Sequence, residues 1–153
     1  MITSKDARFI ISEIRNMPYY VERTSTITKQ IEEIRERIAE ASSPVSPNGG
    51  IDIGEYPDAV RIKILGHGDG TDQRITALVT EEAVLNTERS RYLQRWKDAN
   101  GWKQRLEHTQ DGAFCRDFFV GKSYGRLERE YAVSNAYDRM IRIIRNTIPN
   151  MRG

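Results

Sequence analysis

The chain has 153 residues, which is enough for one ordinary domain or for a small domain joined to an elongated helical part. Its composition, 38% hydrophobic and 30% charged residues, suits a modest core, and no stretch approaches the roughly 20 apolar residues that cross a membrane. The single cysteine excludes an internal disulfide, and one thiol with two distant histidines argues against a zinc site. The first residues mix acidic and basic side chains without an apolar signal core, so we expect a cytoplasmic protein.

Two helices are predicted at the N-terminal end. Apolar residues on one side predict a short helix over about residues 4–16, and Pro18 fits the first turn of the next helix. That second helix, which reaches about residue 41, carries a heptad seam with alternating steps of four and three residues. The seam consists of Tyr20, Thr24, Ile27, Ile31, Ile34 and Ile38. The apolar residues of such a seam must pack against another helix, either of this chain or of a second copy. A homodimer is therefore one of the alternatives.

A Pro/Gly-rich loop is predicted near residues 42–70. Residues 41–50 contain two prolines and two glycines, which rule out a continuing helix, and the alternation in residues 59–65 predicts a short strand. His67, Asp69 and Asp72 lie close together in the sequence. Because glycines flank His67 and Asp69 and remove a rigid scaffold for ligands, a polar loop is favoured over a metal or catalytic site.

A second long helix is predicted from Thr71 to about Asp98, with an end or a kink at Asn100-Gly101. Its apolar residues at helical spacing are Ile75, Leu78, Val79, Leu85, Tyr92 and Trp96. The loop before it is long enough for the two long helices to lie antiparallel. We therefore expect the isoleucines of the first seam to pack within the chain, against Ile75, Leu78 and Leu85.

Shorter helices are predicted towards the C-terminus. After Asp111 the sequence predicts a compact, phenylalanine-rich helix that Gly121 closes. Cys115 lies in this apolar segment and is predicted to be a small buried residue rather than a nucleophile. Leu127 and Tyr131, four residues apart, predict the buried side of a further short helix.

The last helix is predicted to follow a compact turn at Ala132-Val133, with Ser134 as its N-cap. Apolar residues recur along one side of it, at Tyr137, Ile141, Ile144 and Ile148. Polar residues repeat this spacing on the other side, at Asn135, Arg139, Arg142 and Asn146, with Arg145 beside them. Helix, turn and helix in this order are the layout of a helix-turn-helix, whose second helix offers long donors to base edges and phosphates.

Basic residues are concentrated at the same end. From residue 116 onward the chain has eight Lys or Arg and four Asp or Glu residues, a net charge of 8 − 4 = +4. Residues 1–115 have sixteen Lys or Arg and eighteen Asp or Glu residues, a net charge of 16 − 18 = −2. This local charge favours phosphate binding over the alternative, an arginine-rich face that is simply solvated. The candidate DNA-binding residues are Lys122, Ser123, Ser134, Asn135, Arg139, Arg142, Arg145 and Asn146. No convergent cluster of ionisable residues predicts an enzyme, a metal site or a bound cofactor.

Three passages resemble a known family. They are Ile31–Ile38, the loop Ser42–Gly49 with its two Ser-Pro pairs, and Phe118–Tyr124 leading towards Val133-Ser134. They resemble the phage late-gene transcriptional regulators of the RinA/ArpU kind, whose C-terminal part is similar to the promoter-reading C-terminal domain of bacterial sigma factors. Two positions depart from that pattern: Glu128, where a small residue is usual, and Asp138, where an apolar residue is expected.

The sequence thus predicts an all-α protein, with a helical hairpin or coiled coil in residues 1–110 and a helix-turn-helix DNA-binding domain in residues 111–153. The resemblance implies a sigma-factor-like form of that domain, with residues 135–145 as the recognition helix. It further implies a sequence-specific double-stranded DNA-binding activator of phage late genes in a bacterial or phage-infected cell, with RNA polymerase as a second partner.

An alternative belongs to a different functional class. The heptad seam of residues 20–38 is a sharper signal than the helix-turn-helix, and it favours a coiled-coil interaction or assembly protein, such as a phage packaging or scaffold component.

Overall fold

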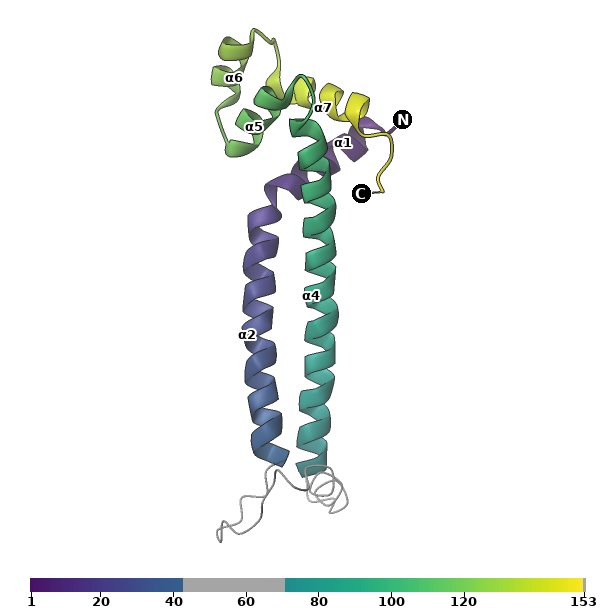
Figure 1. The fold of residues 1–153 in the computed structure, drawn as a ribbon, viewed down its shortest axis with the longest axis vertical. Coiled ribbons are helices and arrows are strands. Elements are labelled where there is room, and N and C mark those ends of the chain that lie inside the picture. The colour runs from purple at the N-terminus through teal and green to yellow at the C-terminus, as the bar shows by residue number, and fades with distance from the viewer. Residues whose placement is uncertain (43–70, 153) are drawn as a thin grey trace. The chain divides into compact units, whose positions relative to one another are not determined.

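The computed structural model describes residues 1–42 and 71–152, and every regular element in these ranges is an α-helix (Figure 1). The all-α class predicted from the sequence is therefore confirmed for this part of the chain. The helices are α1 (Ser4–Arg15), α2 (Met17–Ser42), α4 (Thr71–Glu107), α5 (Gly112–Val120), α6 (Tyr124–Tyr131) and α7 (Ala136–Thr147). None of these helices is both long and apolar enough to cross a membrane. The strand expected over residues 59–65 and its surrounding loop lie outside the described residues.

The chain divides into two compact units. One comprises Met1–Glu22 and Tyr92–Gly153, and the other comprises Arg23–Arg91. The boundaries between the units fall within helices α2 and α4. The sequence suggests a division after residue 110, whereas the contacts group the N-terminal helix α1 with the C-terminal helices.

The unit Arg23–Arg91 is an antiparallel pair of helical segments from α2 and α4 (Figure 1). Ile27, Ile31 and Ile34 are buried on α2, and Ile75 is buried on α4. Three isoleucines of the predicted seam are therefore covered within a single chain, as expected from the two matching apolar patterns. Ile38 of the seam and its predicted partners Leu78 and Leu85 are only partly buried.

Polar side chains along the edges of this pair define its register. Arg23 contacts Glu88 at 3.1 Å, Arg35 contacts Glu82 at 2.6 Å, and Arg89 donates a hydrogen bond to Thr28 at 3.3 Å. Partly exposed ion pairs of this kind contribute only about 0–1 kcal/mol each. The buried isoleucines therefore supply most of the stability of the pair, and the polar contacts favour one alignment of the two segments.

Helix α4 is longer than the sequence predicts. An end or kink is expected at Gly101, but the helix continues to Glu107. A glycine in a helix interior costs about 1 kcal/mol relative to alanine, and buried Trp102 and Leu106 outweigh this cost because they continue the apolar face beyond it. Val79, which is predicted to belong to the seam, is 48% exposed because it falls outside the heptad steps.

The unit formed by Met1–Glu22 and Tyr92–Gly153 has a core to which α1, the end of α4, α5, α6 and α7 all contribute. Helix α1 begins with a capping box, in which Thr3 and Asp6 each accept a hydrogen bond from the other's backbone amide at 3.1 Å. Its predicted buried side is confirmed at Ala7, Ile10, Ile11 and Ile14.

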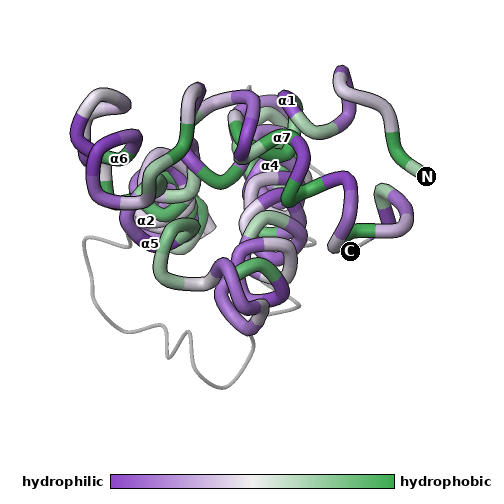
Figure 2. The backbone as a smooth tube through the Cα atoms, turned by 90° about the horizontal axis from the view of Figure 1, so that it is seen from above, coloured by the Kyte–Doolittle hydropathy of each residue, from purple (hydrophilic) through white to green (hydrophobic). Residues whose placement is uncertain are grey.

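Hydrophobic and hydrophilic residues alternate along α7, as expected for an amphipathic helix (Figure 2). Helix α7 packs against both α1 and α6.

A buried ionic network lies in this unit. Glu13 on α1 is 4% exposed, and its carboxylate accepts two hydrogen bonds from Arg95 on α4, at 2.9 and 3.1 Å. A third hydrogen bond comes from the hydroxyl of Tyr20 on α2, whose ring lies 4.9 Å from the Arg95 guanidinium carbon. Burial, and then the hydrogen bond to Glu13, raise the pKa of Tyr20 to about 12. The hydroxyl therefore keeps its proton at neutral pH and remains a donor.

We predict that Ile31→Ala lowers the free energy of unfolding by about 2–5 kcal/mol, because it removes a fully buried side chain from the seam. Urea unfolding followed by circular dichroism measures this loss. Because the seam is covered within one chain, the midpoint should be the same at different protein concentrations.

The matched control is Val84→Ala on α4, a change at a side chain that is 60% exposed. Its effect should stay within about 0.5 kcal/mol. A destabilisation by Ile31→Ala that disappears as protein concentration rises would instead indicate a seam between two chains.

Candidate nucleic-acid interface

Helices α6 and α7 are connected by residues 132–135. Helix α6 is capped by Ser123, whose hydroxyl accepts a hydrogen bond from the Arg126 amide at 3.3 Å. It ends at Ala132, which has the left-handed conformation (φ 54°) common at helix C-termini. Leu127 is fully buried, which confirms the predicted inner side of α6. The result is a short helix, a compact turn and a second helix.

The N-cap of α7 differs from the predicted one. The sequence favours Ser134, but the cap is Asn135, whose side-chain oxygen accepts a hydrogen bond from the Asp138 amide at 3.0 Å. Asparagine and serine are equally good N-caps, so propensity alone does not distinguish the two positions. Ser134 is an exposed residue of the connection. Because capping uses the oxygen of Asn135, its NH₂ group is what remains to bind a ligand.

Ile141, Ile144 and Ile148 of the predicted stripe are buried, but the buried face of α7 is centred further round the helix than predicted. Its centre is a line of fully buried residues spaced by four, namely Ala136, Met140, Ile144 and Ile148. Tyr137, which the sequence predicts in the stripe, is only partly buried. Alanine is apolar but small, so it does not stand out in a hydropathy pattern, yet it allows the helix to approach its neighbours closely.

The outer face of α7 is consequently centred on Asp138, Arg142 and Asn146, which are all exposed and are also spaced by four. Arg139 and Arg145 are only partly exposed. The five residues therefore do not form one uniform polar surface, and each arginine has different surroundings.

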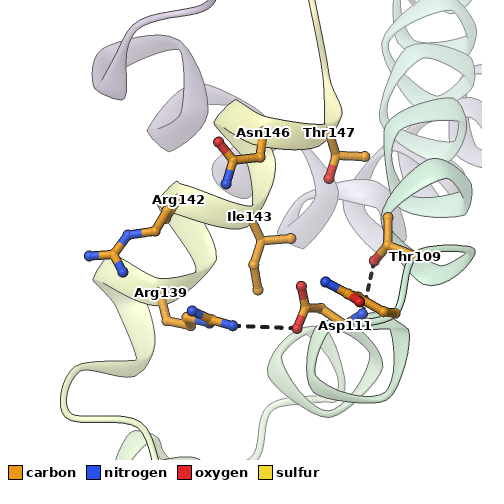
Figure 3. A pocket seen from close by; sticks show the side chains of 8 residues that line it. Thr109, Asp111, Arg139, Arg142, Ile143, Asn146 and Thr147 are labelled. Carbon is orange, nitrogen blue, oxygen red and sulfur yellow. Dashed lines mark hydrogen bonds and ion pairs between the residues drawn. The ribbon is translucent and has the colours of Figure 1, made fainter.

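Arg142 is an exposed cation at the centre of this face. It lines a cleft of about 310 Å³ between α7 and the connection from α4 to α5, together with Asn146 (Figure 3). Arg142 extends away from Asp111, whereas Arg139 points towards it (Figure 3). Among the described residues, none forms a hydrogen bond or an ion pair with the Arg142 guanidinium.

Arg139 is held by an ion pair. Its Nη2 lies 3.6 Å from Oδ1 of Asp111, in the connection between α4 and α5. Both side chains are partly exposed, so the pair contributes only about 0–1 kcal/mol and can be exchanged for another anion. Asp111 therefore reduces the charge that Arg139 offers to a ligand, and neither the charge count nor the helical spacing indicated it as a partner.

Arg145 binds the N-terminal segment of the same chain. Its Nε donates a hydrogen bond to the backbone carbonyl of Ile2 at 3.1 Å, and Nη1 lies 3.5 Å from Oγ of Ser4. These contacts connect α7 to the start of α1. The sequence identifies Arg145 as a DNA-binding candidate, and in the structure much of its donor capacity serves this contact.

Lys122 is also engaged within the protein. Its ammonium lies 3.1 Å from Asp117 and 3.2 Å from Glu130. The hydrogen bonds to Asp117 and then to Glu130 raise the pKa of Lys122. The hydrogen bond from Arg126, and then the one from Lys122, lower the pKa of Glu130. The local charge around Lys122 is thus balanced by two carboxylates. Ser123, its neighbour, serves as the cap of α6.

Four of the predicted residues meet around the start of α7. Ser134, Asn135, Arg139 and Arg142 line a cavity of about 310 Å³ there, whereas Lys122 and Ser123 do not line it. Arg8 of α1 lines a groove together with Arg142, Arg145 and Asn146. No feature of the sequence predicted that Arg8 lies near these residues. Only the packing of α1 on α7 reveals this proximity.

The described residues contain no group of three or more His, Cys, Asp or Glu side chains placed to hold a metal ion. His67 and Asp69 lie outside the described residues. No family model, curated protein or solved structure was found to match the chain.

We predict that Cys115 reacts with iodoacetamide only when the protein unfolds. The side chain is fully buried on α5, and burial raises its pKa to about 12. At pH 8 roughly one thiol in ten thousand is then ionised, and alkylation requires the thiolate. Mass spectrometry after labelling in buffer and in urea measures this directly, since the chain has one cysteine. Rapid labelling of the native protein would show that the thiol is accessible.

Proposed function

We propose that this protein is a sequence-specific double-stranded DNA-binding transcriptional regulator. The observation that carries the proposal is the exposed Arg142 at the centre of the outer face of α7, which pairs with no other residue in the described part of the chain, with Asn146 one turn further along. An exposed helix with such donors fits the major groove of B-DNA, which admits one α-helix. In a helix-turn-helix, α7 would be this recognition helix and α6 the helix that crosses the backbone.

The proposed contacts follow from the chemistry of each side chain. Arg142 offers the paired donors that recognise the O6 and N7 atoms of guanine. Asn146 can form two hydrogen bonds with an adenine edge, and Arg139, held more loosely by Asp111, binds a phosphate. Asn135 contributes its remaining NH₂ group. Lys122 and Arg145 act mainly through contacts within the protein.

The resemblance to phage late-gene regulators suggests the biological role. On this basis the protein activates phage genes in a bacterial host, and RNA polymerase is its second partner. The assembly alternative rests on the heptad seam. Because Ile27, Ile31 and Ile34 are buried within the single chain, that seam does not offer a surface for a partner, and this supports the regulator.

Arg142→Ala should weaken binding to the preferred genomic fragment by about 5- to 150-fold, the equivalent of about 1–3 kcal/mol for one guanine contact. The fragment is first selected from genomic DNA with the wild-type protein, and dissociation constants are then measured at several salt concentrations. Discrimination against unselected DNA should fall by a similar factor.

Lys122→Gln is the comparison for this experiment. Because the Lys122 ammonium is already bound to two carboxylates, its removal should leave the slope of log affinity against log salt unchanged. Equal affinity of Arg142→Ala and wild-type protein at every salt concentration would refute the proposed function.

Asp111→Asn should strengthen DNA binding by up to about 5-fold, because it releases Arg139 from a partly exposed ion pair. The side chain of Asp111 makes no capping hydrogen bond at the start of α5, so the fold should tolerate the change. The same substitution in an Arg139→Ala background tests the cause. The gain should be much smaller there, and an equal gain in both backgrounds would show that Asp111 does not act through Arg139.

A further inference from the structure

Helix α1 packs against α7, and the two helices border a groove of about 400 Å³. The charged side chains that line this groove are Arg8, Arg142, Arg145 and Asp138. Three arginines thus face one carboxylate, and two of the arginines come from α7. The third, Arg8, comes from a helix at the opposite end of the sequence.

Arg8 is available to bind an anion. It is exposed, and no other described residue forms a hydrogen bond or an ion pair with it. Arg145 is fixed on the backbone of Ile2 and beside Ser4, at the start of α1. This contact holds α1 against α7 and thereby fixes where Arg8 lies relative to Arg142. Asp138, in the first turn of α7, is placed where a helix N-terminus stabilises a carboxylate.

We propose that the DNA-binding surface extends from α7 onto α1, and that Arg8 binds a backbone phosphate beside the major groove. This inference rests on the proposed function. A recognition helix fills the major groove, which is about 12 Å wide, so a side chain from the neighbouring helix meets the phosphates at the groove edge rather than the bases. Arg8 therefore contributes affinity and position, and Arg142 contributes base recognition.

The test uses the full chain, the selected genomic fragment and an unselected fragment of equal length. Arg8→Ala should lower the slope of log affinity against log salt by roughly 0.9, the value for one lost phosphate contact. It should weaken binding to both fragments by a similar factor, so that the ratio of the two affinities is unchanged. Arg8→Lys should keep most of the slope, because an ammonium also neutralises a phosphate.

Arg37→Ala is the matched control, because it removes another exposed arginine, in the unit Arg23–Arg91. It should leave both the slope and the affinities unchanged. A loss of slope with Arg37→Ala equal to that with Arg8→Ala would show a general effect of net charge and would overturn the assignment of Arg8.

The outcomes separate this inference from the function on which it rests. If Arg142→Ala weakens DNA binding but Arg8→Ala changes neither slope nor affinity, only the extension onto α1 is wrong. If Arg8→Ala alters the ratio of the two affinities, Arg8 reads sequence and the phosphate assignment is wrong. If the wild-type protein selects no genomic fragment and does not bind DNA, both the function and the extension are overturned.

Discussion

The buried carboxylate of Glu13 holds together three helices of the unit Met1–Glu22 and Tyr92–Gly153. A charge in such a site is tolerated only when it is paired and hydrogen-bonded, and Arg95 and Tyr20 provide both. Arg95 is partly exposed, whereas Glu13 is buried, so removing Arg95 would leave a buried carboxylate without its compensating charge and destabilise this unit. Since the three side chains come from α1, α2 and α4, the network determines how α1 lies within this unit, and the remaining helices pack on that arrangement.

Helix α7 depends on α1 for its own position. Helices α6 and α7 are short and bury too little apolar surface to fold by themselves, so α1, α5 and the end of α4 supply the rest of the core. Arg145 on α7 adds a polar contact to this apolar packing, because it donates a hydrogen bond to the carbonyl of Ile2 just before α1. The exposure of Arg142 therefore follows from the packing of Ala136 and Met140 on the opposite side of the helix.

The three arginines of α7 show why a local excess of basic residues does not measure binding capacity. Arg145 reaches the N-terminal backbone, Arg139 is paired with Asp111, and Arg142 is exposed. The neighbours that distinguish them come from distant parts of the chain. Lys122 illustrates the same point, because two nearby carboxylates balance its charge. The count of eight basic residues from position 116 onward therefore overstates the number of cations available to a phosphate backbone.

The sequence by itself determined the features that repeat at short range. The heptad steps predicted the antiparallel pair of long helices, and the apolar spacing predicted α1, α5 and α6, because helical periodicity is a local property of the chain. The tertiary structure decided the features that depend on several elements at once. Gly101 remains helical because buried residues continue beyond it, and α7 is rotated because Ala136 faces the core. Contacts between residues far apart in the sequence likewise decided how much of Arg139 and Arg145 is left to bind a ligand, and they placed Arg8 of α1 beside α7. The pattern of residues within one helix cannot predict such contacts.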